Sequence, residues 1–214
     1  MIKKIEYTDD DELIILDQTL LPVKEKYLKT KDYEDVIDAI KKLKVRGAPL
    51  IGIAAAYGVV LGLNNGVAEN LNDYEKQFYS LLDAFRKSRP TARNLFYAMD
   101  RIEIAFRENK ELTGRTEKEI IKKLNDALLD EADRIFEEDI EMCKLREKGY
   151  SFKEIGKILK RSEKSCATRY SNRGYTLNPL KLLLNLAIVV LTLLSGAVAE
   201  PTNLFLFSEF HVKI

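Results

Sequence analysis

The sequence has no tryptophan, a single histidine and only two cysteines among its 214 residues. Cys143 and Cys166 are separated by 23 positions, and His211 lies far from both. This spacing is neither that of a disulfide framework nor that of a zinc site. The scarcity of these residues therefore predicts a protein without a metal centre that is suited to the reducing cytoplasm.

An excess of charge of one sign is also missing, since 35 Lys and Arg face 34 Asp and Glu for a net charge of +1. This balance excludes a general attraction to nucleic acid or to membranes. The charge is nevertheless segregated, because residues 1–140 carry a net charge of −5 and residues 141–181 a net charge of +7. The N-terminus lacks the apolar stretch of a secretory signal, so we expect none.

Residues 1–144 are expected to form a mostly helical N-terminal domain with a short β-hairpin. Two short alternating runs around an acidic turn predict the hairpin, and helical periodicity dominates after Asp32, which is placed to cap the first helix. Behind Pro49, the stretch 50–63 is apolar on nearly every side, which predicts a buried helix. Further amphipathic helices are expected over residues 74–88, 91–109 and 117–142, the last with a capping box at Thr116.

Residues 145–176 form a basic helical segment. A capping box at Ser151 and Glu154 predicts one short helix, and Ser162 is placed to cap a second. Two short helices with a tight turn and excess positive charge are typical of helix-turn-helix modules. In that interpretation Lys164, Arg169 and Arg173 contact nucleic acid. The other interpretation is a basic hairpin that is solvated at the surface.

Residues 177–214 are expected to be an apolar remnant of an α/β, Rossmann-like domain, truncated or degenerate. Residues 182–199 are uncharged, a length near the lower limit for a membrane span. Their β-branched cluster favours a buried strand and turn, with membrane insertion or disorder as the alternatives.

An arginine precedes a proline at two predicted helix starts. Arg46 and Gly47 stand before Pro49, and Arg89 stands before Pro90. A helix N-terminus presents unpaired N–H groups, and glycine lets a ligand approach the backbone. Each arginine is either a solvated end group or one half of a shared anion site, where its guanidinium could bind a phosphate through two hydrogen bonds.

Three motifs, LDQTLLP, VRGAPLIGIAAAYGVVLG and SRPTARNLFYAMDRI, occur in this order. Together they resemble the N-terminal domain of the methylthioribose-1-phosphate isomerase family, which is related to the regulatory subunits of translation initiation factor 2B. The resemblance covers residues 1–144.

The resemblance implies an aldose–ketose isomerase of methionine salvage that converts 5-methylthioribose 1-phosphate to 5-methylthioribulose 1-phosphate. It implies no metal and no organic cofactor, and a homodimer is possible. It also implies that the sugar phosphate is bound by Arg46, Gly47, Ala48 and Arg89.

The catalytic pair of the family, a cysteine in a Thr-His-Cys-Asn-Ala-Gly loop and a later aspartate, has no recognisable counterpart. Leu193, Leu194 and Ser195 stand where the loop has His, Cys and Asn. We therefore expect impaired activity from this chain, whose C-terminal part is divergent or truncated. The sequence is compatible with residues 145–214 being native, frameshifted or fused. The alternative function is a regulatory or nucleic-acid-binding protein that reuses the helical domain.

Overall fold

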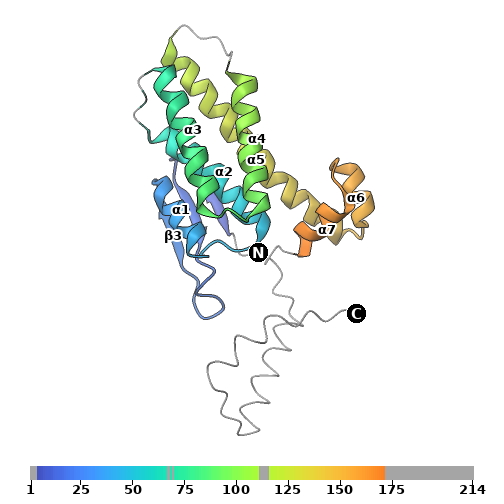
Figure 1. Cartoon of the computed structure of the whole chain (residues 1–214). Helices are drawn as coiled ribbons and strands as arrows, with labels where there is room; N and C mark the ends of the chain where they lie inside the picture. The colour runs from blue at the N-terminus through green and yellow to red at the C-terminus, as the bar shows by residue number, and fades with distance from the viewer. Residues whose placement is uncertain (1–3, 67, 69, 111–115, 172–214) are drawn as a thin grey trace. The chain divides into compact units, whose positions relative to one another are not determined.

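The computed structural model describes residues 4–66, 68, 70–110 and 116–171. They belong to one compact unit, Met1–Arg173, shown in Figure 1. The predictions for residues 177–214, including the strand or membrane span at 182–199, lie outside the described residues. Arg173 lies outside them as well.

The N-terminal residues form a three-stranded antiparallel sheet in the order β1-β2-β3. Its strands are β1 (Ile5–Tyr7), β2 (Leu13–Leu16) and β3 (Tyr27–Thr30). The predicted hairpin is confirmed, with Ile5 opposite Ile15 and Tyr7 opposite Leu13. The third strand was not predicted, because only Thr30 of β3 is buried and its side chains show no apolar alternation. Backbone pairing with β2 holds it in place.

Helix α2 (Ala48–Asn64) is the centre of the helical part, as the apolar stretch predicts. Every residue from Pro49 to Leu63 is buried. The reason is that α2 contacts four other helices: α1 (Tyr33–Lys41), α3 (Leu71–Ser88), α4 (Arg93–Asn109) and α5 (Glu117–Glu147). The predicted cap of α1 is confirmed, since the Asp32 side chain accepts a hydrogen bond from the Glu34 backbone N–H at 2.8 Å.

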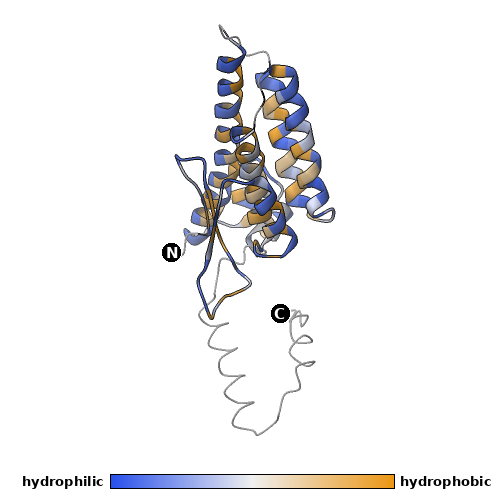
Figure 2. Cartoon of the chain, turned by 90° about the vertical axis from the view of Figure 1, so that its left-hand side faces the viewer, coloured by the Kyte–Doolittle hydropathy of each residue, from blue (hydrophilic) through white to orange (hydrophobic). Residues whose placement is uncertain are grey.

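Three amphipathic helices pack around α2: α3 (Leu71–Ser88), α4 (Arg93–Asn109) and α5 (Glu117–Glu147). Their apolar sides face one another and their polar sides face outward, as Figure 2 shows. Thr116 caps α5 through the Glu119 backbone N–H at 3.2 Å. The mostly helical class with a small antiparallel sheet is therefore confirmed.

The basic segment forms two short helices, α6 (Phe152–Ile158) and α7 (Glu163–Ser171). The capping box at Ser151 and Glu154 is present, and Ser162 accepts from the Ser165 N–H at 3.2 Å. These helices, called the α6–α7 hairpin below, share a small core with the end of α5, made of Met142, Leu145, Ile155 and Cys166. The end of α5 thus supplies a third helix to the hairpin, which the sequence did not reveal.

Candidate functional site

The start of α2 is formed by Gly47, whose φ of 93° suits glycine and few other residues. No side chain caps this helix, and Pro49 lies in its first turn. The N–H groups of a first turn have no partner within the helix and carry a partial positive charge. This end of α2 is therefore available to an anion.

The start of α4 has the same character. Arg89 is the C-cap of α3, and its carbonyl accepts the Ala92 N–H at 3.0 Å in a tight turn. Ala92 is the N-cap of α4, again without a side-chain hydrogen bond, and Arg93 is the first helical residue. By contrast, the side chains of Asp32, Asn70, Thr116 and Ser151 cap α1, α3, α5 and α6.

Gly52 brings the two uncapped helix starts together. A Cβ added at this glycine would lie 2.6 Å from the backbone carbonyl oxygen of Asn94, in the first turn of α4. A contact this short is possible only without a side chain. The second turn of α2 therefore lies against the first turn of α4, which brings the two helix starts close together.

A cavity of about 740 Å³ opens at this junction. From the helical part it is lined by Gly47, Ala48, Ile51, Arg89, Thr91, Ala92, Arg93 and Asn94, and from the α6–α7 hairpin by Ser162, Lys164, Ser165 and Thr168. Three of these lining residues are cationic and none is acidic. Among the described residues, no ion pair involves the three cations. The cavity therefore has an uncompensated positive charge and favours an anion.

The residues predicted to bind a sugar phosphate are only partly brought together. Gly47, Ala48 and Arg89 all line the cavity. Arg46 is exposed and is not among the lining residues. Its Nε donates to the Leu43 carbonyl at 3.2 Å, and its own carbonyl accepts from Gln18 at 3.4 Å.

Of the three residues predicted to contact nucleic acid, only Lys164 has a described side chain. Lys164 lines the same cavity as Arg89, which the sequence did not indicate. Arg169 lies in α7, with its side chain outside the described part, and Arg173 lies outside it entirely. The hydroxyl groups of Ser162, Ser165 and Thr168 were not predicted for this cavity, because nothing in the sequence indicates that the hairpin packs here.

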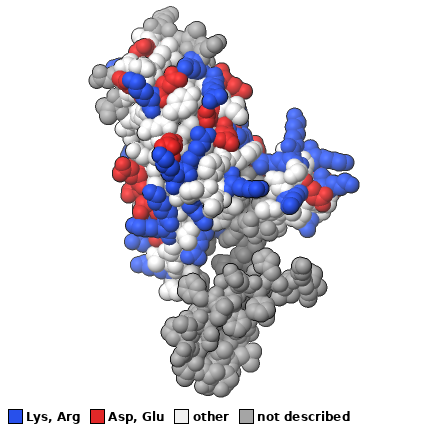
Figure 3. Space-filling view, viewed as in Figure 1, with Lys and Arg blue, Asp and Glu red and all other residues white. Residues whose placement is uncertain are grey.

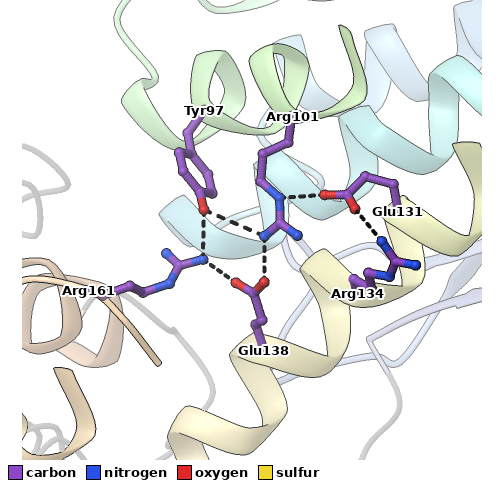
Figure 4. Close-up of polar contacts among 6 residues, drawn as sticks. All are labelled: Tyr97, Arg101, Glu131, Arg134, Glu138 and Arg161. Atoms are coloured by element: carbon purple, nitrogen blue, oxygen red, sulfur yellow. Dashed lines mark hydrogen bonds and ion pairs between the residues drawn. The ribbon is translucent and has the colours of Figure 1, made fainter. Parts of the chain in front are cut away.

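A cluster of polar residues attaches the α6–α7 hairpin to the helical part (Figure 4). Arg161, at the turn between α6 and α7, donates from Nη2 to the Tyr97 hydroxyl of α4 at 3.0 Å and to the Glu138 carboxylate of α5. Its guanidinium also lies over the Tyr97 ring, 5.0 Å from the centroid. The Arg161 side chain is only 11% exposed, so this contact is largely protected from solvent.

Arg101 extends the same cluster between α4 and α5. It donates from Nη1 to Glu138 at 2.7 Å and from Nε to Glu131. Burial alone would raise the pKa of Glu138, but hydrogen bonds and charge from Arg161 and Arg101 outweigh it and lower that pKa. The cluster therefore holds Glu138 as a carboxylate.

Docking of the hairpin should weaken in acid because the folded protein favours the ionised form of Glu138. A lowered pKa contributes stability above the pKa of an unfolded glutamate, about 4.3, and that stability is lost as the pH falls through the lower folded value. We expect the free energy of unfolding, measured by urea denaturation, to drop more between neutral pH and pH below about 4 in the native chain than in Glu138→Gln. Equal drops in the two proteins would contradict the role of this carboxylate.

A second cavity, of about 350 Å³, lies between α4 and α5 and has a different character. Its lining includes Arg101 and Arg134 but also Glu108, Asp130 and Glu131. Glu131 pairs with both arginines. The positive and negative charges of this second cavity thus compensate one another. The second cavity therefore lacks the preference for an anion that the first cavity has.

Within residues 4–66, 68, 70–110 and 116–171, no group of three His, Cys, Asp or Glu side chains is arranged to hold a metal ion. In the same part of the chain no helix has both the length and the apolar character needed to cross a membrane.

Known sequences resemble the helical part, which builds one side of this cavity. Residues 44–151 match the sequence model of the "Initiation factor 2 subunit family". The chain is 45% identical over 134 residues to 5-deoxyribose 1-phosphate isomerase of Petrotoga mobilis, and 48% identical over 139 residues to methylthioribose-1-phosphate isomerase of Carboxydothermus hydrogenoformans. These matches cover 63% and 64% of this chain but only 37% and 38% of the relatives.

Two solved structures share the fold. A 5-methylthioribose 1-phosphate isomerase from Pyrococcus horikoshii superposes with a TM-score of 0.61, and translation initiation factor eIF-2B subunit delta from A. fulgidus with 0.57. Each is 31% identical in sequence, and each match covers 66% of this chain and 38% of the other. The chain belongs to the initiation factor 2 subunit family that includes the methylthioribose-1-phosphate isomerases, and it spans little more than a third of the length of these relatives.

Proposed function

We propose that this chain binds a ribose 1-phosphate with a small 5-substituent in the cavity at the starts of α2 and α4. The candidate ligands are 5-methylthioribose 1-phosphate and 5-deoxyribose 1-phosphate, the sugars in the names of its relatives. In the first case the chain would act in methionine salvage, on the isomerisation to 5-methylthioribulose 1-phosphate. The observation that carries this proposal is the cavity lined by three cations and no acid.

The form of the cavity supports a small phosphorylated ligand. Its volume of about 740 Å³ lies in the range usual for small-molecule sites. Two uncapped helix starts supply N–H groups for phosphate oxygens, and Arg89 can donate two parallel hydrogen bonds to them. The hydroxyl and amide groups of Thr91, Asn94 and Thr168 can bind the sugar hydroxyls.

Titration calorimetry tests the proposal directly. We expect 5-methylthioribose 1-phosphate or 5-deoxyribose 1-phosphate to bind with a dissociation constant in the micromolar to millimolar range that is usual for metabolites. Unphosphorylated 5-methylthioribose, the matched control, should bind far more weakly because it lacks the anion. Equal heats from the sugar with and without phosphate would contradict the proposal.

Turnover is a separate matter. The family chemistry needs an acid and a base on either side of the sugar carbons, and Leu193, Leu194 and Ser195 replace the His, Cys and Asn of the family loop. Neither cysteine is a substitute, because Cys143 donates from Sγ to the Asp139 carbonyl and Cys166 is buried in the hairpin core. We propose that the chain binds the sugar phosphate with little isomerisation, which NMR detection of the ketose product measures.

Nucleic-acid binding is the second candidate function, favoured by one observation. The end of α5 and the α6–α7 hairpin share a core, and Lys and Arg side chains gather on the hairpin surface (Figure 3). A three-helix unit of this kind is typical of DNA-binding modules. A DNA duplex in the same calorimeter gives the contrast: salt-sensitive binding of the duplex with no response to the sugar phosphate would favour this function.

A further inference from the structure

We propose that the α6–α7 hairpin forms one wall of the sugar-phosphate site, with Lys164 as a phosphate-binding residue and Arg161 as the residue that positions it. The inference rests on the proposed function and adds to it a contact that the family resemblance does not supply. The hairpin helices, over residues 152–171, lie beyond the stretch 44–151 that matches the family. This wall therefore lies outside the stretch that matches the family model.

The orientation of α7 directs one side of the helix toward the cavity. Lys164, Ser165 and Thr168 line the cavity, and this spacing places them on one face of a helix. Cys166 lies on the opposite face and is buried against α5 and α6. The packing of this core residue thus fixes which side of α7 is presented to the ligand.

The attachment through Arg161 fixes the position of that wall. Arg161 directly precedes Ser162, which caps α7, and its guanidinium is held by Tyr97 of α4 and Glu138 of α5. The Arg161 guanidinium is hydrogen-bonded to Tyr97 and Glu138 of the helical part. Arg161 is not among the residues that line the cavity. It therefore acts through the position of α7 and leaves Lys164 to meet the ligand.

Charge explains why the ligand group is the phosphate. Arg89 and Arg93 come from the helical part and Lys164 from the hairpin, and no acidic side chain lies among the lining residues. A phosphomonoester between these walls meets cations from two sides together with the hydroxyl groups of Ser162 and Ser165. Hydrogen bonds to ionised groups are about twice as strong as neutral ones. Loss of Lys164 should therefore lower the affinity for the phosphorylated sugar and leave the affinity for the unphosphorylated sugar unchanged.

The test compares two lysines of the hairpin. Lys164→Ala should weaken binding of 5-methylthioribose 1-phosphate roughly tenfold, the loss of one charge-assisted contact. Lys157→Ala, the matched control, removes the same charge from an exposed position of α6 outside the cavity lining and should leave affinity unchanged. The difference between the two lysines should vanish for unphosphorylated 5-methylthioribose.

A double-mutant cycle tests the positioning role of Arg161. If Arg161 acts through Lys164, Arg161→Ala weakens binding in the native background and has little further effect in Lys164→Ala. Arg161→Lys should restore part of the affinity, because it keeps one cation beside Glu138. Circular dichroism distinguishes a displaced hairpin from an unfolded one, because only unfolding of α6 and α7 lowers the helix content.

The outcomes distinguish the two levels of the proposal. If the native chain does not bind the sugar phosphate, the proposed function itself fails. If the native chain binds, Arg89→Ala weakens binding and Lys164→Ala matches Lys157→Ala, the function stands and the role of the hairpin is overturned. Lys164→Ala that lowers only the affinity for DNA also overturns it.

Discussion

Replacing Arg89 by alanine should weaken binding of 5-methylthioribose 1-phosphate by roughly 10- to 100-fold, the effect of losing one or two charge-assisted hydrogen bonds. Arg89 is half-buried and lines the cavity beside the uncapped start of α4. No described residue forms a salt bridge with Arg89. Its replacement therefore leaves no carboxylate without its ion-pair partner, and a change in affinity can be assigned to the lost arginine. Titration calorimetry of the native and variant proteins measures the change.

Two further variants separate geometry from charge. Arg89→Lys keeps the positive charge but loses the planar group that can donate two parallel hydrogen bonds, so it should recover only part of the affinity. Arg107→Ala removes an exposed arginine near the far end of α4, about 20 Å along the helix from its start. The site at α4 would be refuted if Arg107→Ala and Arg89→Ala had the same effect.

Replacing Gly52 by alanine should damage both the fold and the site. The new Cβ would lie 2.6 Å from the Asn94 carbonyl oxygen, which belongs to the backbone and cannot rotate away. Overpacking of this kind typically costs about 1–3 kcal/mol, more than the gain of up to about 1 kcal/mol from alanine in a helix. We expect a lower free energy of unfolding in urea and weaker sugar-phosphate binding, because relief of the clash moves the start of α4.

Gly62→Ala in the same helix is the matched control. Its Cβ would meet the Leu81 side chain at 2.7 Å, and a leucine methyl group can move more easily than a backbone carbonyl. Gly62 also lies at the other end of α2, away from the cavity. If Gly62→Ala lowered the affinity as much as Gly52→Ala, the loss of binding would be due to the lower stability of the fold and not to a displaced start of α4.

Local patterns were sufficient for most of the fold. The buried helix α2 follows from an apolar run that has no polar side. The caps of α1 and α6 follow from Asp32 and Ser151, whose side chains accept a hydrogen bond from a backbone N–H two or three residues later. The positive φ of Gly47 agrees with the glycine and proline that open α2. In each case the interacting groups are close in the chain, and their spacing is visible in the sequence.

Strand β3 and the role of Arg46 needed the structure. Three of the four residues of β3 are exposed or half-buried, so its position depends on backbone pairing with β2 and leaves little trace in its side chains. Arg46 precedes a helix start as Arg89 does, yet only Arg89 lines the cavity. The direction of an exposed side chain depends on its surroundings, which for Arg46 include the carbonyl of Leu43.

The sequence alone was sufficient for the helical class, the buried central helix and the two arginine-bearing helix starts, because these depend on residues within a few positions of one another. The tertiary structure decided that Arg89 and Lys164 face one cavity and that Arg161 holds the hairpin there through Tyr97 and Glu138. These contacts join residues more than twenty positions apart. The packing of α7 against the end of α5, together with the Arg161 contacts, brings them together. Lys164, which by sequence fits a nucleic-acid contact, therefore lines the cavity that we propose as an anion site.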